Sequence, residues 1–291
     1  MSTDLPADLR CPLSGHELVR SADELECPCG RRYPIRDGIP QLIYPDELLP
    51  SDAEFQRKYD EGAERYDDGL DWLWRAFDVD EMAVRRGMID LLVAQPGARI
   101  LEIGAGTGRD SRLILEQIAP DGRLVAQDLS HGMLRVAREK LAAAGDRVSY
   151  IVSNAAFLPF ADASFDAAYH FGALNTFGDV RRSLAEITRV VRPGGRVVIG
   201  DEGVAPWLQQ RLYGRILRAA NPLYRHRPPL HLLPENALDL RLRWLIGNAF
   251  YLLDYRVGEG PPFVDLDLPI PGRGDSLRSR YAERGKAARR A

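Results

Sequence analysis

Long hydrophobic runs are absent from this chain of 291 residues, and cysteine is scarce, with three in all. No apolar run approaches the roughly 20 residues that a membrane-spanning helix needs, and the first residues lack the basic and then apolar pattern of a signal peptide. These absences predict a cytoplasmic protein without a membrane span. Acidic residues outnumber basic ones by 42 to 39, so the chain as a whole does not attract phosphate backbones, which argues against nucleic acid as the main partner.

The segment from Arg99 to Asp128 is the most informative part of the sequence. The apolar run Ile100–Ile103 is typical of a buried parallel strand, and the Gly-Ala-Gly-Thr-Gly turn at 104–108 lets the chain bend sharply into a helix. Asp128 ends the next apolar run, where a carboxylate can accept hydrogen bonds from both hydroxyls of a ribose. Arg109 stands where the dinucleotide fingerprint needs a small residue, which argues against a nicotinamide cofactor.

The Glu-Ile-Gly-Ala-Gly-Thr-Gly segment at 102–108 resembles the first motif of class I S-adenosylmethionine-dependent methyltransferases. Further landmarks follow in the family's order: Leu-Ser-His-Gly-Met-Leu at 129–134, Ser-Asn-Ala and Phe-Leu-Pro-Phe within 153–160, Ser-Phe-Asp at 164–166 and Arg-Pro-Gly-Gly at 192–195. The resemblance spans roughly residues 55–203. It implies an α/β, Rossmann-like seven-stranded fold and S-adenosylmethionine as cofactor.

By this resemblance, the cofactor-binding residues are Tyr66, Glu102, Gly104, Ala105, Gly106, Asp128, Leu129, Met133, Asn154, Ala155 and His170. Leu129 and Met133 would pack on the adenine. Asn154 replaces the family's usual aspartate, but its carbonyl oxygen can still accept a hydrogen bond from the adenine amino group. The Tyr-Asp-Glu-Gly-Ala-Glu-Arg-Tyr-Asp segment at 59–67 is similar to a helical cover found before many small-molecule methyltransferase cores, including those of ubiquinone and menaquinone biosynthesis. Its tyrosines could instead only pack.

Methyl transfer from a sulfonium is an in-line displacement, and it needs a general base only when the acceptor must lose a proton. The candidates are His170, at the end of the fourth strand, and Asp201 and Glu202, at the end of the fifth, because open α/β sheets bind ligands at the carboxyl ends of their strands. His170 could instead only shape the pocket through a backbone hydrogen bond. The two acids could instead cap a helix that starts near Pro206.

The preferred acceptor is a small organic molecule of phenolic, quinone-like or secondary-metabolite type, because the chain supplies many aromatic residues for a pocket. Its candidate contacts are Tyr59, Phe171, Asn175, Trp207, Tyr224 and His231. Two other functions stay open. One is an RNA methyltransferase, suggested by the amino-terminal cysteine segment and the arginine-rich end of the chain. The other is a cofactor-binding protein that does not methylate, either a regulatory or scaffold partner or an enzyme that uses the same site for another reaction such as a cyclisation.

All three cysteines lie in the first thirty residues, which indicates a separate small module. The segment from Cys11 to the Tyr-Pro-Ile-Arg-Asp-Gly-Ile-Pro stretch at 33–40 resembles the zinc-ribbon-like element fused to some methyltransferases. Ser14 stands where a second cysteine is expected, so the preferred interpretation is a ribbon that has lost its metal and is stabilised by packing. The alternative is a zinc ion held by Cys11, Cys27 and Cys29, with His16 as the fourth ligand.

We expect five segments: a zinc-ribbon-like module (1–45), a helical lid or linker (46–95), the cofactor-binding core (96–203), the end of the core with a substrate lid and the last strand pair (204–270), and a mobile basic tail (271–291). Within the fourth segment the pattern predicts an amphipathic helix over Trp207–Ala220, an irregular stretch over Asn221–Pro234, and a strand pair over Arg243–Val257 that turns near Gly247. The proline-rich stretch that follows is the candidate contact for a homodimer.

Overall fold

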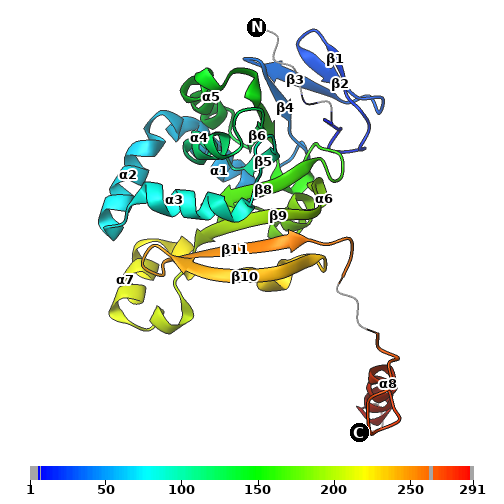
Figure 1. The fold of residues 1–291 in the computed structure, drawn as a ribbon. Coiled ribbons are helices and arrows are strands. Elements are labelled where there is room, and N and C mark those ends of the chain that lie inside the picture. Colours follow the sequence, from blue (N-terminus) through cyan, green and yellow to red (C-terminus); the bar gives the residue numbers. More distant parts are fainter. Residues whose placement is uncertain (1–5, 7, 262–264, 289–291) are drawn as a thin grey trace. The chain divides into compact units, whose positions relative to one another are not determined.

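The computed structural model describes residue 6, residues 8–261 and residues 265–288 (Figure 1). The chain divides into two compact units, Met1–Glu259 and Gly260–Ala291. Within the described residues, no helix is both long enough and apolar enough to cross a membrane.

One mixed sheet organises the first unit, with the strand order β1-β2-β3-β4-β7-β6-β5-β8-β9-β11-β10. Its strands are β1 (Val19–Ser21), β2 (Glu24–Glu26), β3 (Arg32–Arg36), β4 (Ile39–Leu42), β5 (Arg99–Ile103), β6 (Arg123–Asp128), β7 (Val148–Ser153), β8 (Phe165–Phe171), β9 (Val191–Glu202), β10 (Ala237–Leu245) and β11 (Phe250–Val257).

Helices connect and cover these strands (Figure 1). The α-helices of the first unit are α1 (Pro50–Gly62), α2 (Tyr66–Phe77), α3 (Glu81–Ile89), α4 (Arg109–Gln117), α5 (His131–Lys140), α6 (Val180–Val190) and α7 (Leu212–Ala220). Short 3₁₀ turns are η1 (Ala63–Arg65), η2 (Asp90–Leu92), η3 (Ala142–Arg147), η4 (Ala155–Phe157), η5 (Leu174–Thr176), η6 (Pro206–Leu208), η7 (Pro222–Arg225) and η8 (Leu230–Leu232).

The centre of the sheet confirms the expected Rossmann-like fold. β7, β6, β5, β8 and β9 run parallel in that order, and β11 joins β9 in the antiparallel direction, followed by β10. Parallel strands of this kind are buried on both faces and therefore read as nearly continuous apolar runs. Ile100 and Leu101 illustrate this, because neither is exposed and the two belong to hydrophobic clusters on opposite faces.

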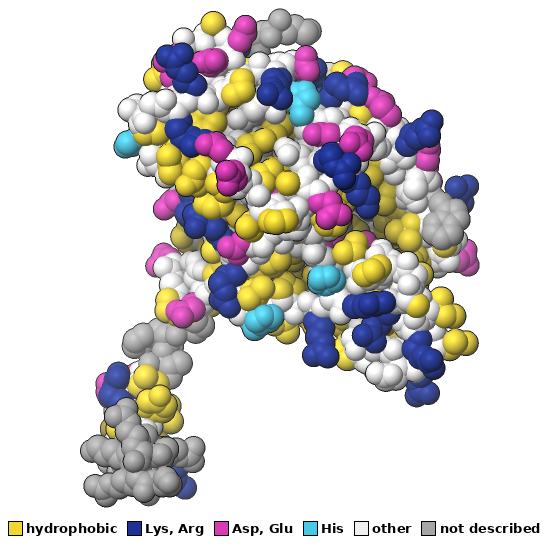
Figure 2. Space-filling model, turned by 180° about the vertical axis from the view of Figure 1, so that it is seen from behind, with side chains coloured by type: hydrophobic (Ala, Val, Ile, Leu, Met, Phe, Trp, Pro, Cys, Tyr) yellow, Lys and Arg dark blue, Asp and Glu magenta, His cyan; other side chains and the backbone are white. Residues whose placement is uncertain are grey.

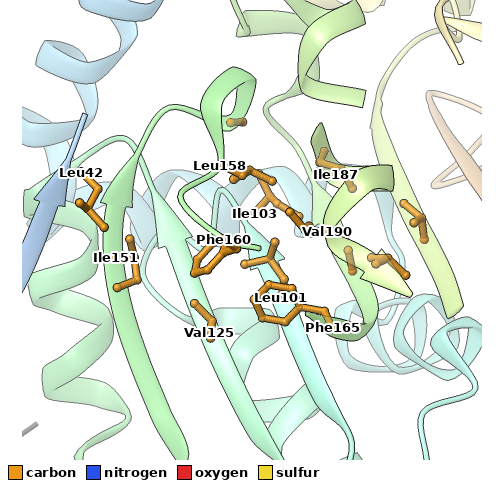
Figure 3. Packing of buried hydrophobic residues seen from close by; sticks show 14 of the residues in the cluster. Leu42, Leu101, Ile103, Val125, Ile151, Leu158, Phe160, Phe165, Ile187 and Val190 are labelled. Carbon is orange, nitrogen blue, oxygen red and sulfur yellow. The ribbon is translucent and has the colours of Figure 1, made fainter. Parts of the chain in front are cut away.

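Helices complete the core on each face. Met88 of α3, Ile114 of α4 and Leu134 of α5 belong to one cluster, whereas Ile187 and Val190 of α6 belong to the other. Figure 3 shows this second cluster, in which side chains from neighbouring parallel strands meet those of α6 and of the loop that carries Leu158 and Phe160. The core thus lies on both sides of the parallel strands and leaves their carboxyl ends for polar groups.

Residues 8–42 join this core. β1, β2 and β3 form an antiparallel meander, and β4 pairs with β7 in parallel, with Gln41 opposite Val152. Leu9, Leu25 and Tyr33 are buried in the same cluster as α6. The amino-terminal strands therefore extend the main sheet and share its core.

Three segments differ from the sequence-based expectations. Instead of one helix over Trp207–Ala220, the 3₁₀ turn η6 precedes a shorter α7, and a Cβ on Gly214 would lie 2.1 Å from the carbonyl oxygen of Leu208, so the glycine permits this close approach. The first strand of the final pair already begins at Ala237. The arginine-rich end, expected to be a mobile tail, forms helix α8 (Leu277–Ala288) in the second unit, consistent with its content of good helix formers.

We expect Gly195→Ala to destabilise the fold by about 1–3 kcal/mol, because a Cβ there would lie 2.5 Å from both the carbonyl oxygen of Asp166 and a side-chain carbon of Val191. Gly87→Ala is the matched control. Gly87 lies inside α3 with open space around it, so alanine should leave the free energy of unfolding unchanged or raise it by up to about 1 kcal/mol. Urea unfolding of both variants measures the difference, and equal midpoints would show that the packing around Gly195 is looser than described.

Candidate active site

The glycine-rich turn lies at the carboxyl end of β5, and its backbone conformation explains its composition. Gly104 and Gly106 have φ angles of +62° and +55°, a region that glycine adopts without steric cost. A Cβ on Gly104 would also lie 3.2 Å from the ring of His170. The turn therefore presents bare backbone to whatever lies against it.

Asp128 connects this turn to the next one. Its carboxylate accepts hydrogen bonds from the backbone N–H of Gly106, at 2.8 Å, and from that of Ser130, at 2.9 Å. Burial raises the pKa of Asp128 to about 6, although these backbone hydrogen bonds oppose the shift. The carboxylate is thus ionised at neutral pH and loses its charge in mildly acidic solution.

Two narrow cavities, of about 90 and 60 Å³, lie beside the glycine turn, and Gly104 lines both. The first has an apolar wall made of Tyr66, Leu70, Leu73, Trp74, Phe77, Phe171, Ile246 and Phe250. The second is lined by Gln127, Asp128, Leu129, Ser130, Asn154 and Ala155 together with Asp52, Phe55, Gln56, Tyr59, Ala173, Thr176 and Phe177. An elongated ligand with a nucleoside at one end would extend across the glycine turn from one cavity to the other.

The polar side of the first cavity carries one carboxylate oxygen without a partner. Glu202, at the end of β9, lines this cavity, and its Oε2 is buried with no hydrogen-bond partner among the described residues. Its neighbour Asp201 is fully buried, and burial together with the Glu202 carboxyl raises the pKa of Asp201 well above its usual range. Buried polar atoms normally have partners, so the orphaned Oε2 marks the place where a ligand group can bind.

Helices α1 and α2 lie over the two turns and are attached to them by acidic residues. Asp60 accepts hydrogen bonds from Ser130 Oγ at 2.5 Å and from the backbone N–H of Gly132 at 2.8 Å. Asp67 accepts one from Thr107 Oγ1 at 2.7 Å. The two aspartates of the repeated Tyr-Asp pair therefore hold this cover on the loops, while Tyr59 and Tyr66 contact each other edge to face.

Most of the predicted cofactor residues line the cavities. Tyr66, Glu102, Gly104, Ala105 and Gly106 line the first, and Asp128, Leu129, Asn154 and Ala155 line the second.

Met133 is an exception. It lines neither cavity and is packed under the cover with Ala63 and Val136, against Tyr59 and Tyr66, because it lies on the face of α5 that meets α1. Asn154 uses its carbonyl oxygen to accept the N–H of Ala156 at 2.9 Å.

His170 and Asp201 do not have the exposed geometry expected of a base. The His170 ring is fully buried, with Nδ1 2.8 Å from the carbonyl oxygen of Ile103 and Nε2 accepting the N–H of Ala173 at 3.3 Å. Burial lowers its pKa to about 4, so the ring is neutral and both nitrogens are engaged. The Asp201 carboxylate accepts the N–H groups of Asn175 and Glu202. Both residues hold the loop after β8, and neither lines a cavity or caps η6.

The predicted substrate contacts divide in the same way. Phe171 lines the first cavity and Tyr59 the second. Tyr224 is buried behind the wall, edge-on to Phe250. Asn175 donates to the backbone oxygen of Glu202, while Trp207 and His231 are exposed and line neither cavity.

Much of the cavity wall and its polar floor are not among the residues predicted from the sequence. Arg85 lines the first cavity and forms a buried ion pair of 2.7 Å with Asp110, beside the buried Glu102. Burial raises the pKa of Glu102 well above its usual range, and Ser111 donates a hydrogen bond to it. One signal was available, because the wall residues at 66, 70, 73, 74 and 77 follow the spacing of one helix face.

The three cysteines of the amino-terminal strands form a second cluster. The sulfur atoms of Cys11, Cys27 and Cys29 all lie within 4.8 Å of one another. His16, the predicted fourth ligand, is not part of this cluster in the structure. His16 is exposed and outside the cluster, because its carbonyl oxygen pairs with the N–H of Cys11 across a tight turn, and Ser14 Oγ lies 3.3 Å from the sulfur of Cys27 instead.

Hydrogen bonds shift the acidity of this cluster. Burial raises the pKa of Cys11, but hydrogen bonds from Ser14, from the Tyr33 hydroxyl and from the backbone outweigh it and lower this pKa to about 6. A thiolate is therefore available at neutral pH, and thiolates are the ligands that zinc prefers.

The parallel sheet, the glycine turn and the buried acid at the next strand end define a Rossmann-like nucleoside-binding fold of the methyltransferase type. Residues 101–199 match the family described as "Methyltransferase domain". The chain is 34% identical over 184 residues to the demethylmenaquinone methyltransferase of Clavibacter sepedonicus, covering 60% of this chain and 69% of that protein. It belongs to the class I S-adenosylmethionine-dependent methyltransferase family.

Two further comparisons agree with this family and fold. The demethylmenaquinone methyltransferase of Beutenbergia cavernae is 34% identical to this chain over 169 residues. The match covers 55% of this chain and 63% of that protein, so the chain spans less than two thirds of that relative's length. Phosphoethanolamine N-methyltransferase 2 of Haemonchus contortus, solved in complex with S-adenosyl-L-methionine, matches with a TM-score of 0.56 and 15% identity, over 76% of this chain and 62% of that one. This last likeness concerns the fold alone.

We expect the affinity for S-adenosylmethionine to fall about tenfold for each pH unit below about 6, because protonation removes the acceptor that Asp128 offers to the ribose. Asp128→Asn should bind about 10- to 100-fold more weakly at neutral pH and lose this pH dependence. Calorimetric titrations at pH values from about 5 to about 8, in steps of about one pH unit, measure both effects. Asp23→Asn, an exposed site, is the control. A wild-type affinity that stays constant down to pH 5 would contradict this placement of the ribose.

Proposed function

We propose that this protein transfers the methyl group of S-adenosylmethionine to a small, largely apolar acceptor with an acidic hydroxyl, of the phenol or quinol class. The observation that carries the proposal is the buried, unpartnered Oε2 of Glu202 in the cavity beside the glycine turn, which has an aromatic and aliphatic wall and a polar floor of Arg85, Glu102 and Asp110. The names of the relatives, which refer to demethylmenaquinone, point to the same chemical class.

The residues beside the glycine turn fit the cofactor chemically. Asp128 would accept the ribose hydroxyls, and Leu129 and Ala155 offer apolar contacts to an adenine in the second cavity. Glu102 and Arg85, on the floor of the first cavity, are suited to the amino and carboxylate groups of the methionine part. When bound, S-adenosylmethionine supplies an electrophilic methyl group on a sulfonium.

The apolar wall has two effects on the reaction. Phe171, Phe250 and the side chains of α2 orient a flat ring by contact with its faces and edges. They also exclude water, which strengthens the electrostatic effect of Glu202 on a hydroxyl placed beside it. Both cavities are smaller than the roughly 300 Å³ of typical ligand pockets, so we infer that α1 and α2 move outward to admit ligands.

Glu202 is placed to accept the proton of the acceptor's hydroxyl. Removing that proton converts a phenol or quinol into a phenolate, whose oxygen and ring carbons are far better nucleophiles. The nucleophile forms a bond to the methyl carbon while the carbon–sulfur bond breaks, and the sulfonium becomes a neutral thioether. Asp201 and Asn175 act as positioning residues, because they fix the backbone on both sides of Glu202.

Glu202→Gln should lower kcat by about 100- to 10,000-fold on water-soluble quinols, since the amide cannot take the hydroxyl proton. Affinity for S-adenosylmethionine should stay within about twofold of wild type, because Glu202 does not line the second cavity, where we place the ribose and the adenine. Formation of S-adenosylhomocysteine measures the rate. Glu235→Gln, on the exposed surface, should behave as wild type. Wild-type turnover by Glu202→Gln would show that Glu202 is not the base.

We further propose that Cys11, Cys27 and Cys29 bind one zinc ion that links the turns at 11–14 and 27–29. Three thiolates fit zinc, and the fourth position of a tetrahedral site would be taken by water or the Ser14 hydroxyl. Such a site is structural, because the cysteines lie in the amino-terminal strands and line neither cavity beside the glycine turn.

The full chain should contain about one zinc per molecule by elemental analysis, and cobalt substitution should give thiolate-to-metal absorption. Cys29→Ser should lose the metal, whereas His16→Ala should keep it, since His16 lies outside the cluster. Loss of the metal in His16→Ala would show that His16 is a ligand. A wild-type chain that does not take up zinc or cobalt would refute the site.

A further inference from the structure

We call the surface formed by η6, α7, η7 and the segment up to Pro234 the α7 face. Its sequence carries an excess of positive charge. Residues 203–234 contain five arginines and no acidic residue. Because the whole chain has a net charge of −3, the remaining residues together carry −8. The five are Arg211, Arg215, Arg218, Arg225 and Arg227.

These arginines are not neutralised by the protein. None of the five forms an ion pair within the part of the chain that the structure describes, although many other arginines do, such as Arg85, Arg109 and Arg189. In the view of Figure 2, dark blue side chains and yellow hydrophobic ones occur together on the lobe that carries α7, at the lower right. The α7 face therefore offers a positive field to an external partner.

Large apolar side chains project from the same surface. Leu212 and Ile216, one helical turn apart on α7, are 74% and 57% exposed, and Trp207 is 61% exposed with its ring edge-on to Trp244. Exposed leucine, isoleucine and tryptophan flanked by arginines are the pattern of a helix that lies in a membrane interface, with its apolar side in the acyl boundary and its cations among the headgroups.

We propose that the α7 face binds the surface of a membrane that contains anionic phospholipid. Charge complementarity selects anionic headgroups, and the apolar side chains between the arginines favour a lipid surface over RNA, which would need the charge but not Leu212 and Ile216.

The face also adjoins the first cavity. Leu208 and Leu217 pack against the cluster that contains Ile246 and Phe250, two residues of the cavity wall. Docking would thus place the cavity close to the bilayer, where an apolar acceptor dissolves. This last step rests on the proposed function, whereas the docking itself does not.

Flotation of the full chain with vesicles tests the docking. We expect binding to vesicles of phosphatidylcholine mixed with phosphatidylglycerol, much weaker binding to phosphatidylcholine alone, and a decrease with added salt. Changing Arg211, Arg215 and Arg218 to glutamine should weaken binding on the order of 100-fold, at about fivefold per arginine. The double variant Leu212→Asp and Ile216→Asp should also lose binding.

Matched controls separate the face from general charge and hydrophobicity. Changing Arg86, Arg112 and Arg123 to glutamine alters the net charge equally on exposed side chains elsewhere, and Val19→Asp alters an apolar residue that is 65% exposed. Both controls should bind vesicles as wild type does. Methylation of a water-soluble quinol should be unchanged in all these variants, so failure of docking is distinguishable from failure of the proposed activity.

Three outcomes would overturn the proposal. The first is equal or absent binding to both kinds of vesicle. The second is tight binding of single-stranded RNA that needs the arginines but not Leu212 and Ile216, together with no vesicle binding. The third is a dimer in sedimentation analysis that Leu212→Asp dissociates, because a second copy of the chain would then cover the face.

Discussion

The hydrogen bonds from the N–H groups of Gly106 and Ser130 to Asp128 hold together the part of the molecule on which the site depends. The parallel strands are apolar on both faces, so polar groups can gather only where the strands end. A buried carboxylate is costly unless its oxygens are hydrogen-bonded, and these two bonds therefore fix the glycine turn against the turn that follows β6. Asp60 and Asp67 attach the helical cover to the same two turns.

The ends of β8 and β9 position the candidate base. At the ends of β8 and β9, the polar atoms of His170 and Asp201 form hydrogen bonds with backbone groups. The carboxylate of Glu202, at the end of β9, lines the first cavity instead. These two hydrogen-bonded side chains hold the backbone around one carboxylate that has no partner among the described residues. The arrangement separates positioning from chemistry, as expected when a reacting group must be held within a fraction of an ångström.

The central strands, the glycine turn and the position of Asp128 could be predicted from sequence, because each depends on local patterns of apolar residues and glycine. The wall of the first cavity could not be predicted, because it is formed by α2 together with Ile246 and Phe250, which lie more than 160 residues later in the chain. A local sequence pattern does not predict a contact between such distant segments. Residue type alone also did not show that His16 lies outside the cysteine cluster or that Met133 lines neither cavity. The direction of each side chain is decided by a backbone turn or a helix face that only the folded chain defines.

Phe250 connects the three regions that the acceptor would meet. Its ring lies 6.2 Å from that of Phe77 in α2, 5.7 Å from that of Phe171 at the end of β8, and 5.8 Å from that of Tyr224 in η7. The helical cover, the strand end and the segment after α7 thus share one aromatic contact. Because close-packed interiors transmit displacements, a shift of the segment after α7 would reach the cavity wall through this ring. Any partner that binds the α7 face therefore acts on the same residues that shape the acceptor's pocket.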